Sequence, residues 1–184
     1  YFSRSFTESE QDAELLNRAL FGSGEWPLRD AGAVDDETIA FTAKSRLPER
    51  LHPVLERALA GWTALSDPVP GMAEVVWALK RGGAGLYVLS NAGMNIEDQL
   101  RRSPAYEAFD GVVFSAAERV MKPDARLYRT LCDRYALNPQ ACLFVDDNAL
   151  NVAGAERVGM SAYRFDGDVE AFKKALASYG LALA

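Results

Sequence analysis

The chain has 184 residues, of which 49% are apolar and 25% charged, so it is long and apolar enough for one globular domain with a small insertion and is not a disordered chain. Its net charge of −6 repels a polyanion, which excludes nucleic acid as the main partner, and no run of about 18 apolar residues could span a membrane. Neither of its two cysteines belongs to a C-x-x-C pattern, which predicts reduced thiols in a cytoplasmic protein.

The first third of the chain has the pattern of helices alone. Residues 7–10 (Thr-Glu-Ser-Glu) have the form of a capping box and predict a helix that reaches about Leu20. Glycines at 22 and 24 interrupt it, and a second helix is predicted from Asp35 or Asp36 to about Lys44. Pro53 has the place of a first-turn proline and leads an apolar stretch to residue 65. The segment 66–71, with two prolines and a glycine, predicts a linker.

After Pro70 the pattern changes to alternating strands and helices. A helix is predicted over residues 71–81, followed by four short apolar runs at 86–89, 112–114, 142–145 and 162–165. These runs do not alternate with polar residues, as is typical of strands that are buried on both faces. Helical stretches at 94–101, 124–136 and 149–158 separate most of them. The alternation predicts an α/β fold with a parallel sheet.

The first candidate site segment follows the run at 86–89. Ser90, Asn91, Ala92 and Gly93 offer a hydroxyl, an amide and backbone N–H groups at a helix start, and in open parallel sheets ligands bind at the carboxyl ends of the strands. This combination suits a phosphate group. A helix cap followed by a turn is the other reading of the same residues.

The second candidate segment follows the run at 142–145. Asp146 and Asp147 are adjacent carboxylates that repel each other unless a cation holds them. Mg²⁺ favours one or two carboxylates together with phosphate oxygens and water, so the pair predicts a magnesium site. The alternative is a pair of helix N-terminal caps, but capping needs only one of the two.

Between these segments Lys122 precedes a proline and a predicted helix, where an ammonium group can neutralise a phosphate, although most single lysines are surface residues. The order of the segments carries more information than any one of them. The chain resembles the haloacid-dehalogenase-like (HAD) hydrolase superfamily. Residues 89–91 resemble its second motif, Lys122-Pro123 its third, and residues 145–151 its fourth. The stretch 121–160 is especially similar to small sugar-phosphate phosphatases and to the phosphatase domains of epoxide hydrolases.

The resemblance implies a Rossmann-like three-layer core with a parallel sheet at residues 67–184 and a mostly helical cap at residues 1–66. It also implies a role for each matching residue. Ser90 and Asn91 would hold the phosphoryl group, Lys122 would stabilise the nucleophile and the phosphoryl charge, and Asn151 would orient Lys122 or the acidic pair. Asp147 would bind Mg²⁺, with Asp146 as a second or water-mediated ligand. The expected substrate is a small phosphate ester.

One motif of the family is absent from these residues. Its first strand, which ends in Asp-x-Asp, carries the nucleophile and the general acid of the phosphatases. The early acids of this chain follow no buried strand pattern, and the chain does not start with methionine. We therefore expect the central strand and its nucleophile upstream of Tyr1, and the 184 residues by themselves to be inactive.

Three other functions compete with the phosphatase. A dehalogenase of the same superfamily uses no metal, and the paired Asp146-Asp147 argues against it. The second is a non-catalytic binding module, a relative that has lost the nucleophile, and the sequence upstream of Tyr1 would show whether the nucleophile is present. A receiver-type signalling domain would place its acidic pair first and its lysine last, whereas this chain has Ser90, Lys122 and then the acidic pair.

The predicted cap contributes two candidate substrate-binding residues. Trp26 and Arg29 lie in a predicted glycine-flanked loop, where relatives place residues that cover the substrate. Arg29 could meet a substrate anion and Trp26 could pack over a sugar. The alternative is a tryptophan in the cap core and a solvated arginine.

Overall fold

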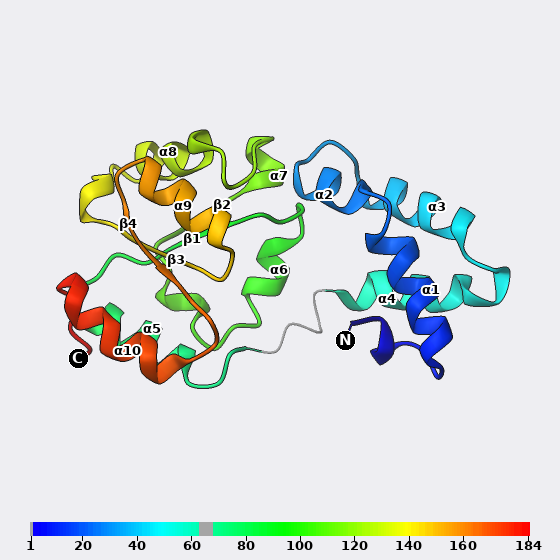
Figure 1. Cartoon of the computed structure of the whole chain (residues 1–184), viewed down its shortest axis with the longest axis horizontal. Coiled ribbons are helices and arrows are strands. Elements are labelled where there is room, and N and C mark those ends of the chain that lie inside the picture. Colours follow the sequence, from blue (N-terminus) through cyan, green and yellow to red (C-terminus); the bar gives the residue numbers. More distant parts are fainter. Residues whose placement is uncertain (1, 63–67) are drawn as a thin grey trace.

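The structure is a computed structural model that describes residues 2–62 and 68–184. Its helices and strands form two groups, which Figure 1 shows side by side. One group holds the helices up to residue 61, and the other holds the strands and the later helices of the described residues. Among the described residues, no helix has the length and apolar character that crossing a membrane requires. The predicted linker falls partly on residues 63–67, which lie outside the described part.

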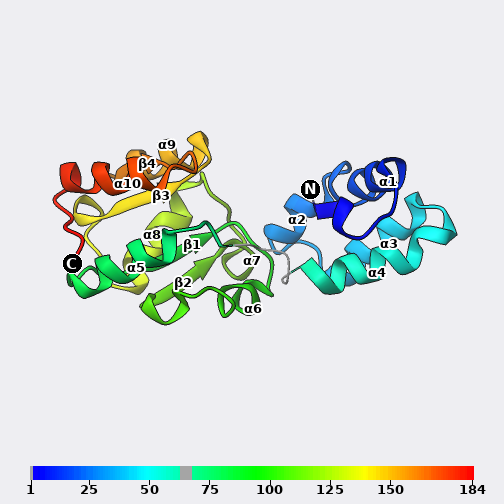
Figure 2. The ribbon, with the colours of Figure 1, turned by 90° about the horizontal axis from the view of Figure 1, so that it is seen from below.

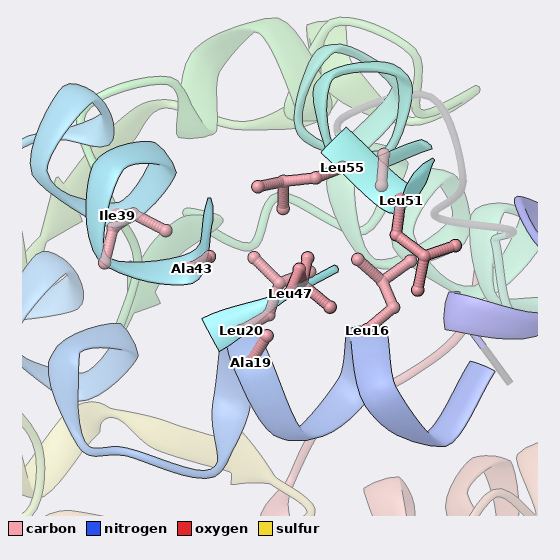
Figure 3. Close-up of a cluster of buried hydrophobic side chains, with 9 residues drawn as sticks. Leu16, Ala19, Leu20, Ile39, Ala43, Leu47, Leu51 and Leu55 are labelled. Atoms are coloured by element: carbon pink, nitrogen blue, oxygen red, sulfur yellow. The ribbon is translucent and has the colours of Figure 1, made fainter. Parts of the chain in front are cut away.

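Within residues 2–62, the helical group contains four α-helices and two short 3₁₀ helices. They are η1 (Phe2–Ser5), α1 (Glu10–Phe21), α2 (Glu25–Asp30), α3 (Asp36–Arg46), η2 (Glu49–Leu51) and α4 (His52–Gly61). Figure 3 shows their shared core, in which α1 contributes Leu16, Ala19 and Leu20, α3 contributes Ile39 and Ala43, and the segment 47–58 contributes the rest. These helices thus bury apolar side chains against one another.

Two sequence expectations for this group were wrong in detail. The cap of α1 is Ser9, whose hydroxyl accepts the N–H of Asp12, and not Thr7, because the helix begins two residues later than the capping-box pattern indicated. The predicted loop around Trp26 and Arg29 is helix α2. Gly24 precedes that helix in the left-handed region at φ +85. The glycine that was expected only to interrupt the preceding helix therefore also allows a new helix to begin.

The second group alternates strands and helices, as the sequence predicted. In chain order it contains α5 (Met72–Arg81), β1 (Tyr87–Ser90), α6 (Ile96–Leu100), η4 (Tyr106–Ala108), β2 (Gly111–Phe114), α7 (Ser115–Glu118), α8 (Ala125–Arg134), η5 (Pro139–Ala141), β3 (Leu143–Asp146), α9 (Ala149–Arg157), β4 (Ser161–Arg164), α10 (Val169–Leu176) and η6 (Ala177–Tyr179). Each strand starts within one residue of its predicted position. Helices α7 and α10 were not predicted from the sequence.

The strands form two parallel pairs. β1 pairs with β2 and β3 pairs with β4, and no ladder joins the two pairs within the described residues. The expectation of strands buried on both faces was met only in part. Leu89, Val113 and Phe144 are buried, whereas Val145 is 36% exposed and β4 has no buried residue. A four-residue strand with a neighbour on one side only leaves much of its surface uncovered.

Helices cover both faces of these strands, which gives the three layers that the resemblance implied. On one face α8 and α9 contribute Leu127, Tyr128 and Ala155 to a cluster with Leu89 and Phe144. On the other face α5 and α10 contribute a separate cluster made of Val75, Leu79, Phe172 and Leu176. In Figure 1, α8 and α9 lie above the strands and α5 and α10 below them, and Figure 2 shows the same layers from below. The predicted α/β class is confirmed.

Candidate active site

The candidate site is centred on Lys122, which lies in the turn before α8. Its ammonium nitrogen donates to the backbone carbonyl of Leu89 at 2.7 Å and to Asp146 Oδ2 at 2.7 Å. Leu89 is near the end of β1 and Asp146 ends β3, so Lys122 connects the carboxyl ends of the two strand pairs. The side chains of Lys122 and Asp146 are only 7% and 9% exposed, which makes them a buried ion pair.

Asn91 fixes the backbone at Lys122. Its side-chain oxygen accepts the Lys122 N–H at 2.8 Å, and its side-chain nitrogen donates to the Lys122 carbonyl at 3.0 Å. A side-chain amide can make both bonds at once because it carries a donor and an acceptor. The loop after β1 and the turn before α8 therefore hold each other, although 31 residues separate them in sequence.

Asp146 accepts hydrogen bonds on both carboxylate oxygens. Oδ2 receives Lys122, while Oδ1 receives the N–H of Asn148 at 2.9 Å and Asn151 Nδ2 at 3.0 Å. Burial acts to raise the pKa of Asp146, but the hydrogen bonds from Lys122 and Asn148 and the positive charge of Lys122 outweigh it. The pKa of Asp146 therefore lies below its ordinary value, and the carboxylate is charged at neutral pH.

The backbone of Asn151 is held in place by Tyr128, which lies on the buried side of α8. The Tyr128 hydroxyl donates to the Asn151 carbonyl at 2.7 Å, and Tyr128 is fully buried. Burial, together with the nearby charge of Asp146, raises the pKa of Tyr128 to about 12. The apolar spacing of α8 is the same for a tyrosine that only packs and for one that also donates a hydrogen bond, so this role could not be predicted from the spacing.

Ser90 and Asp147 carry the free polar groups of the site. Neither the Ser90 hydroxyl nor the Asp147 carboxylate has a partner in the part of the chain that the structure describes. Asp147 is exposed, and its backbone carbonyl accepts the N–H of Arg164 Nε at 3.2 Å. Asp146, Asp147 and Arg164 line a cleft of about 760 Å³ at the ends of β3 and β4, together with the apolar Val69 and Met72. The site therefore offers an open carboxylate and an unpaired hydroxyl.

These residues fit a magnesium ion on the chemistry of their donors. Residues 2–62 and 68–184 contain no group of three or more histidine, cysteine or acidic side chains that would hold a metal by themselves. Mg²⁺ does not require such a group, because it usually keeps several waters and takes one or two carboxylates. Asp147 offers a carboxylate without a protein partner, and Asp146 is next to it in the chain.

The two candidate residues of the helical group lie on α2, and Arg29 also contacts the strand-containing group. The Arg29 guanidinium is only 6% exposed and pairs with Asp36 and with Asp30, and its Nη2 donates to Asn95 Oδ1 at 2.8 Å. The alternative of a solvated arginine is therefore wrong. Arg29 also lies 5.1 Å from the ring centroid of Trp26, which packs in an aromatic cluster with Phe21 and Trp62. Both side chains are thus engaged within the fold, and Arg29 lines a second cleft of about 820 Å³.

The comparison with family models identifies the class to which this chain belongs. Residues 9–159 match the model of the haloacid dehalogenase-like hydrolases. The match covers most of the chain, including Ser90, Lys122 and the acidic pair at 146–147. The chain is therefore a member of the haloacid dehalogenase-like hydrolase family, as the resemblance indicated.

Two kinds of characterised relative are similar to the chain in sequence. It is 28% identical over 138 residues to the (S)-2-haloacid dehalogenase 4A of Burkholderia cepacia, a match over 74% of this chain and 59% of that protein. It is 32% identical over 99 residues to a sesquiterpene phosphatase of Aspergillus oryzae, a match over 53% of this chain and 50% of that protein. The chain thus spans little more than half the length of these relatives.

Solved structures agree with the fold. A dehalogenase structure with an intermediate complex superposes with a TM-score of 0.69 at 25% identity, over 90% of this chain and 77% of that one. A HAD-family enzyme from Bacteroides thetaiotaomicron, in complex with magnesium and inorganic phosphate, superposes with a TM-score of 0.67 over 86% of this chain and 88% of that one. At 16% identity this second likeness concerns the fold alone.

Proposed function

We propose that the protein is a magnesium-dependent phosphatase that hydrolyses a small phosphate monoester such as a sugar phosphate. The observation that carries the proposal is the meeting of three segments at one place. The loop at 90–91, the ammonium group of Lys122 and the carboxylate of Asp146 are joined by hydrogen bonds of 2.7 to 3.0 Å. The adjacent carboxylates of Asp146 and Asp147 are oxygen ligands suited to Mg²⁺, which favours phosphoryl transfer, and a phosphatase is among the relatives.

The roles follow from what each group has free. The Ser90 hydroxyl and the backbone N–H groups of its loop would hold phosphoryl oxygens. Lys122 would place positive charge beside the reacting group, and Asn91 and Asn151 would keep Lys122 and Asp146 in position. Asp147 would hold Mg²⁺, with Asp146 as a further or water-mediated ligand. When bound, the ion would neutralise charge on the phosphoryl oxygens.

The balance of charge supports a metal-dependent reaction. Lys122 is already paired with Asp146, so the pair adds little net positive charge to the site. Asp147 adds a negative charge. A phosphoryl group that carries about two negative charges would be repelled here unless a cation accompanied it. Magnesium at Asp147 meets this requirement.

The reaction also needs a nucleophile that accepts the phosphoryl group. Asp146 is unsuited to the role because both its oxygens already accept hydrogen bonds. We assign the role to an aspartate on a strand upstream of Tyr1, where the family resemblance places it. The residues encoded before Tyr1 test this part of the proposal directly. The cytoplasmic location inferred from the cysteines also stays a prediction.

The test is hydrolysis of p-nitrophenyl phosphate by the full-length protein. We expect turnover with Mg²⁺ and none in excess chelator. Asp147→Asn should abolish turnover without changing the melting temperature, because Asp147 is exposed. A matched control is Asp166→Asn, which alters another exposed acid at the rim of the same cleft. Full activity of Asp147→Asn, or turnover that persists in chelator, would reject the assignment.

A second candidate function is hydrolysis of a 2-haloacid, and it is favoured by the longest of the sequence matches described above, to the Burkholderia dehalogenase. That chemistry uses no metal in this superfamily. Halide release from 2-chloropropionate in the presence of chelator, with no release of phosphate from a panel of phosphate esters, would select this function. It would also leave Asp147 without a role, so Asp147→Asn would then retain full activity.

A further inference from the structure

Ser115 is a buried polar residue that none of the assigned roles uses. It begins α7 directly after β2, and its side chain is 0% exposed. Its hydroxyl accepts the N–H of Ala92 at 2.9 Å and donates to the backbone carbonyl of Asp30. A longer contact of 3.4 Å reaches the Ala92 carbonyl. One hydroxyl thus connects the end of helix α2 with the loop that follows β1.

The two partners of Ser115 belong to different parts of the fold. Asp30 is the last residue of α2 in the helical group, and Ala92 is two residues after Ser90. Figures 1 and 2 show α2 beside α7. The Ala92 carbonyl accepts a second bond, from the N–H of Ala116 at 3.2 Å. Both polar groups of the Ala92 backbone are therefore fixed by the start of α7.

Close packing reinforces the same junction. Gly32 lies against the backbone carbonyl of Ala116, so closely that a Cβ on Gly32 would overlap it. Gly93 lies against the Arg29 guanidinium in the same way, and Arg29 also donates to Asn95. The glycines allow backbone and guanidinium to approach where a side chain would separate them. Helix α2 and the loop at 91–95 therefore cannot move apart without breaking several contacts together.

We propose that Ser115 is a positioning residue that couples the docking of α2 to the conformation of the anion-binding loop. When α2 is docked, the Ser115 hydroxyl donates its hydrogen bond to the Asp30 carbonyl. Its oxygen lone pairs are then directed at the Ala92 N–H. When α2 moves away, the hydroxyl loses this partner and is free to rotate toward the Ala92 carbonyl. The loop that follows Ser90 then loses the fixed acceptor of its Ala92 N–H, while the Ala92 carbonyl keeps the N–H of Ala116. The functional half of this proposal rests on the phosphatase assignment above.

A serine with a structural role alone would make the same two hydrogen bonds, but a change at Asp30 would not alter the bond to Ala92. The two cases differ in a double-mutant cycle read at the Ala92 amide, because sites that share a partner show non-additive effects. Gly32→Ala pushes α2 off Ala116, and Ser115→Ala removes the hydroxyl. Arg29→Lys, which loosens the same junction through the Asn95 contact, serves where Gly32→Ala fails to fold. Ser3→Ala is the matched control, because Ser3 has a buried hydroxyl with no hydrogen-bond partner among the described residues.

The measurement is hydrogen exchange of the Ala92 amide in the full-length protein. We expect Gly32→Ala to speed this exchange by about tenfold when Ser115 is present and by less than about twofold in the Ser115→Ala background. Ser3→Ala should leave the rate unchanged. The coupling would be overturned if neither Gly32→Ala nor Arg29→Lys changed the exchange rate of the Ala92 amide. It would also be overturned if the effects of Gly32→Ala and Ser115→Ala on that rate were independent and simply multiplied.

Titration with inorganic phosphate and Mg²⁺ then tests the functional half. We expect Gly32→Ala and Ser115→Ala each to weaken phosphate binding by about fivefold or more, and Ser3→Ala to have no effect. Equal binding in all variants would refute the link from α2 to the anion site. If the unaltered protein binds no phosphate, the phosphatase assignment fails, and amide exchange still decides whether Ser115 couples the two parts.

Discussion

Removing the ammonium group of Lys122 should destabilise the protein in a way that depends on pH. Lys122→Met keeps the length of the side chain but leaves the Asp146 carboxylate without its cation and the Leu89 carbonyl without a partner. The Lys122 and Asp146 side chains are 7% and 9% exposed, so water cannot replace the lost partner fully. Breaking a buried pair in this way typically costs about 3–5 kcal/mol, and we expect about 3 kcal/mol at pH 7.

The pH dependence follows from the pKa of Asp146. In the unaltered protein this pKa is below the unfolded value of about 3.9, so the stability that the pair contributes is complete above pH 4 and is lost as the pH falls further, through the folded pKa. In Lys122→Met burial acts without the opposing lysine, and the pKa of Asp146 should rise above 3.9. The folded variant then binds a proton more tightly than its unfolded chain, so its stability falls as the pH rises from 4 to 7. The loss relative to the unaltered protein should therefore shrink to about 1 kcal/mol near pH 4.5.

The assay is urea unfolding of both proteins at pH 7 and pH 4.5. The control is Lys173→Met, which removes the lysine of an exposed helix pair with Glu170 at 2.7 Å and should cost less than about 0.5 kcal/mol at either pH. A Lys122→Met loss that is the same at both pH values would refute the claim that Asp146 is charged and buried beside this lysine. So would a loss no larger than that of the control.

Three other predictions concern single sites. Asn151→Leu should lower stability by about 1–2 kcal/mol in thermal melts, because it removes the 3.0 Å bond to Asp146, and no loss would contradict that bond. Gly111→Ala should cost about 1–3 kcal/mol in urea unfolding, because a Cβ would overlap the Tyr135 ring; an unchanged midpoint would mean that the ring moves freely. Burial raises the pKa of the Cys132 thiol, so this thiol should react with a disulfide reagent only after unfolding, and rapid reaction of the folded protein would disprove its burial.

The strands could be predicted from the sequence because their composition is a local property. The runs of β-branched and aromatic residues place all four strands to within one residue of their observed ends. The helix α10 could also have been found, since Asp168 caps it and Phe172 and Leu176 are spaced four residues apart on its buried side. Helix α2 could not, because its six residues follow glycines that elsewhere end helices.

The candidate site was predictable as a set of segments but not as a set of contacts. The sequence places Ser90 and Asp146 at the carboxyl ends of strands and Lys122 just before a helix, and parallel topology brings the strand ends to one edge of the fold. That Lys122 pairs with Asp146, while Asp147 stays exposed, depends on which side of the strand end each side chain leaves. The burial of Arg29 likewise depends on contacts with Asn95, 66 residues away in the sequence.

The core of the helical group is built from its own residues, since the described members of its buried cluster all lie between Leu16 and Ala58. Because this core contains no strand residue, the helical group could be replaced as a unit. A chimera that carries the corresponding helices of another family member would keep both interiors intact and would alter the contacts between the groups, among them those of Arg29, Gly32 and Ser115. The stability of such a chimera should therefore depend on matching the few residues through which the two groups touch.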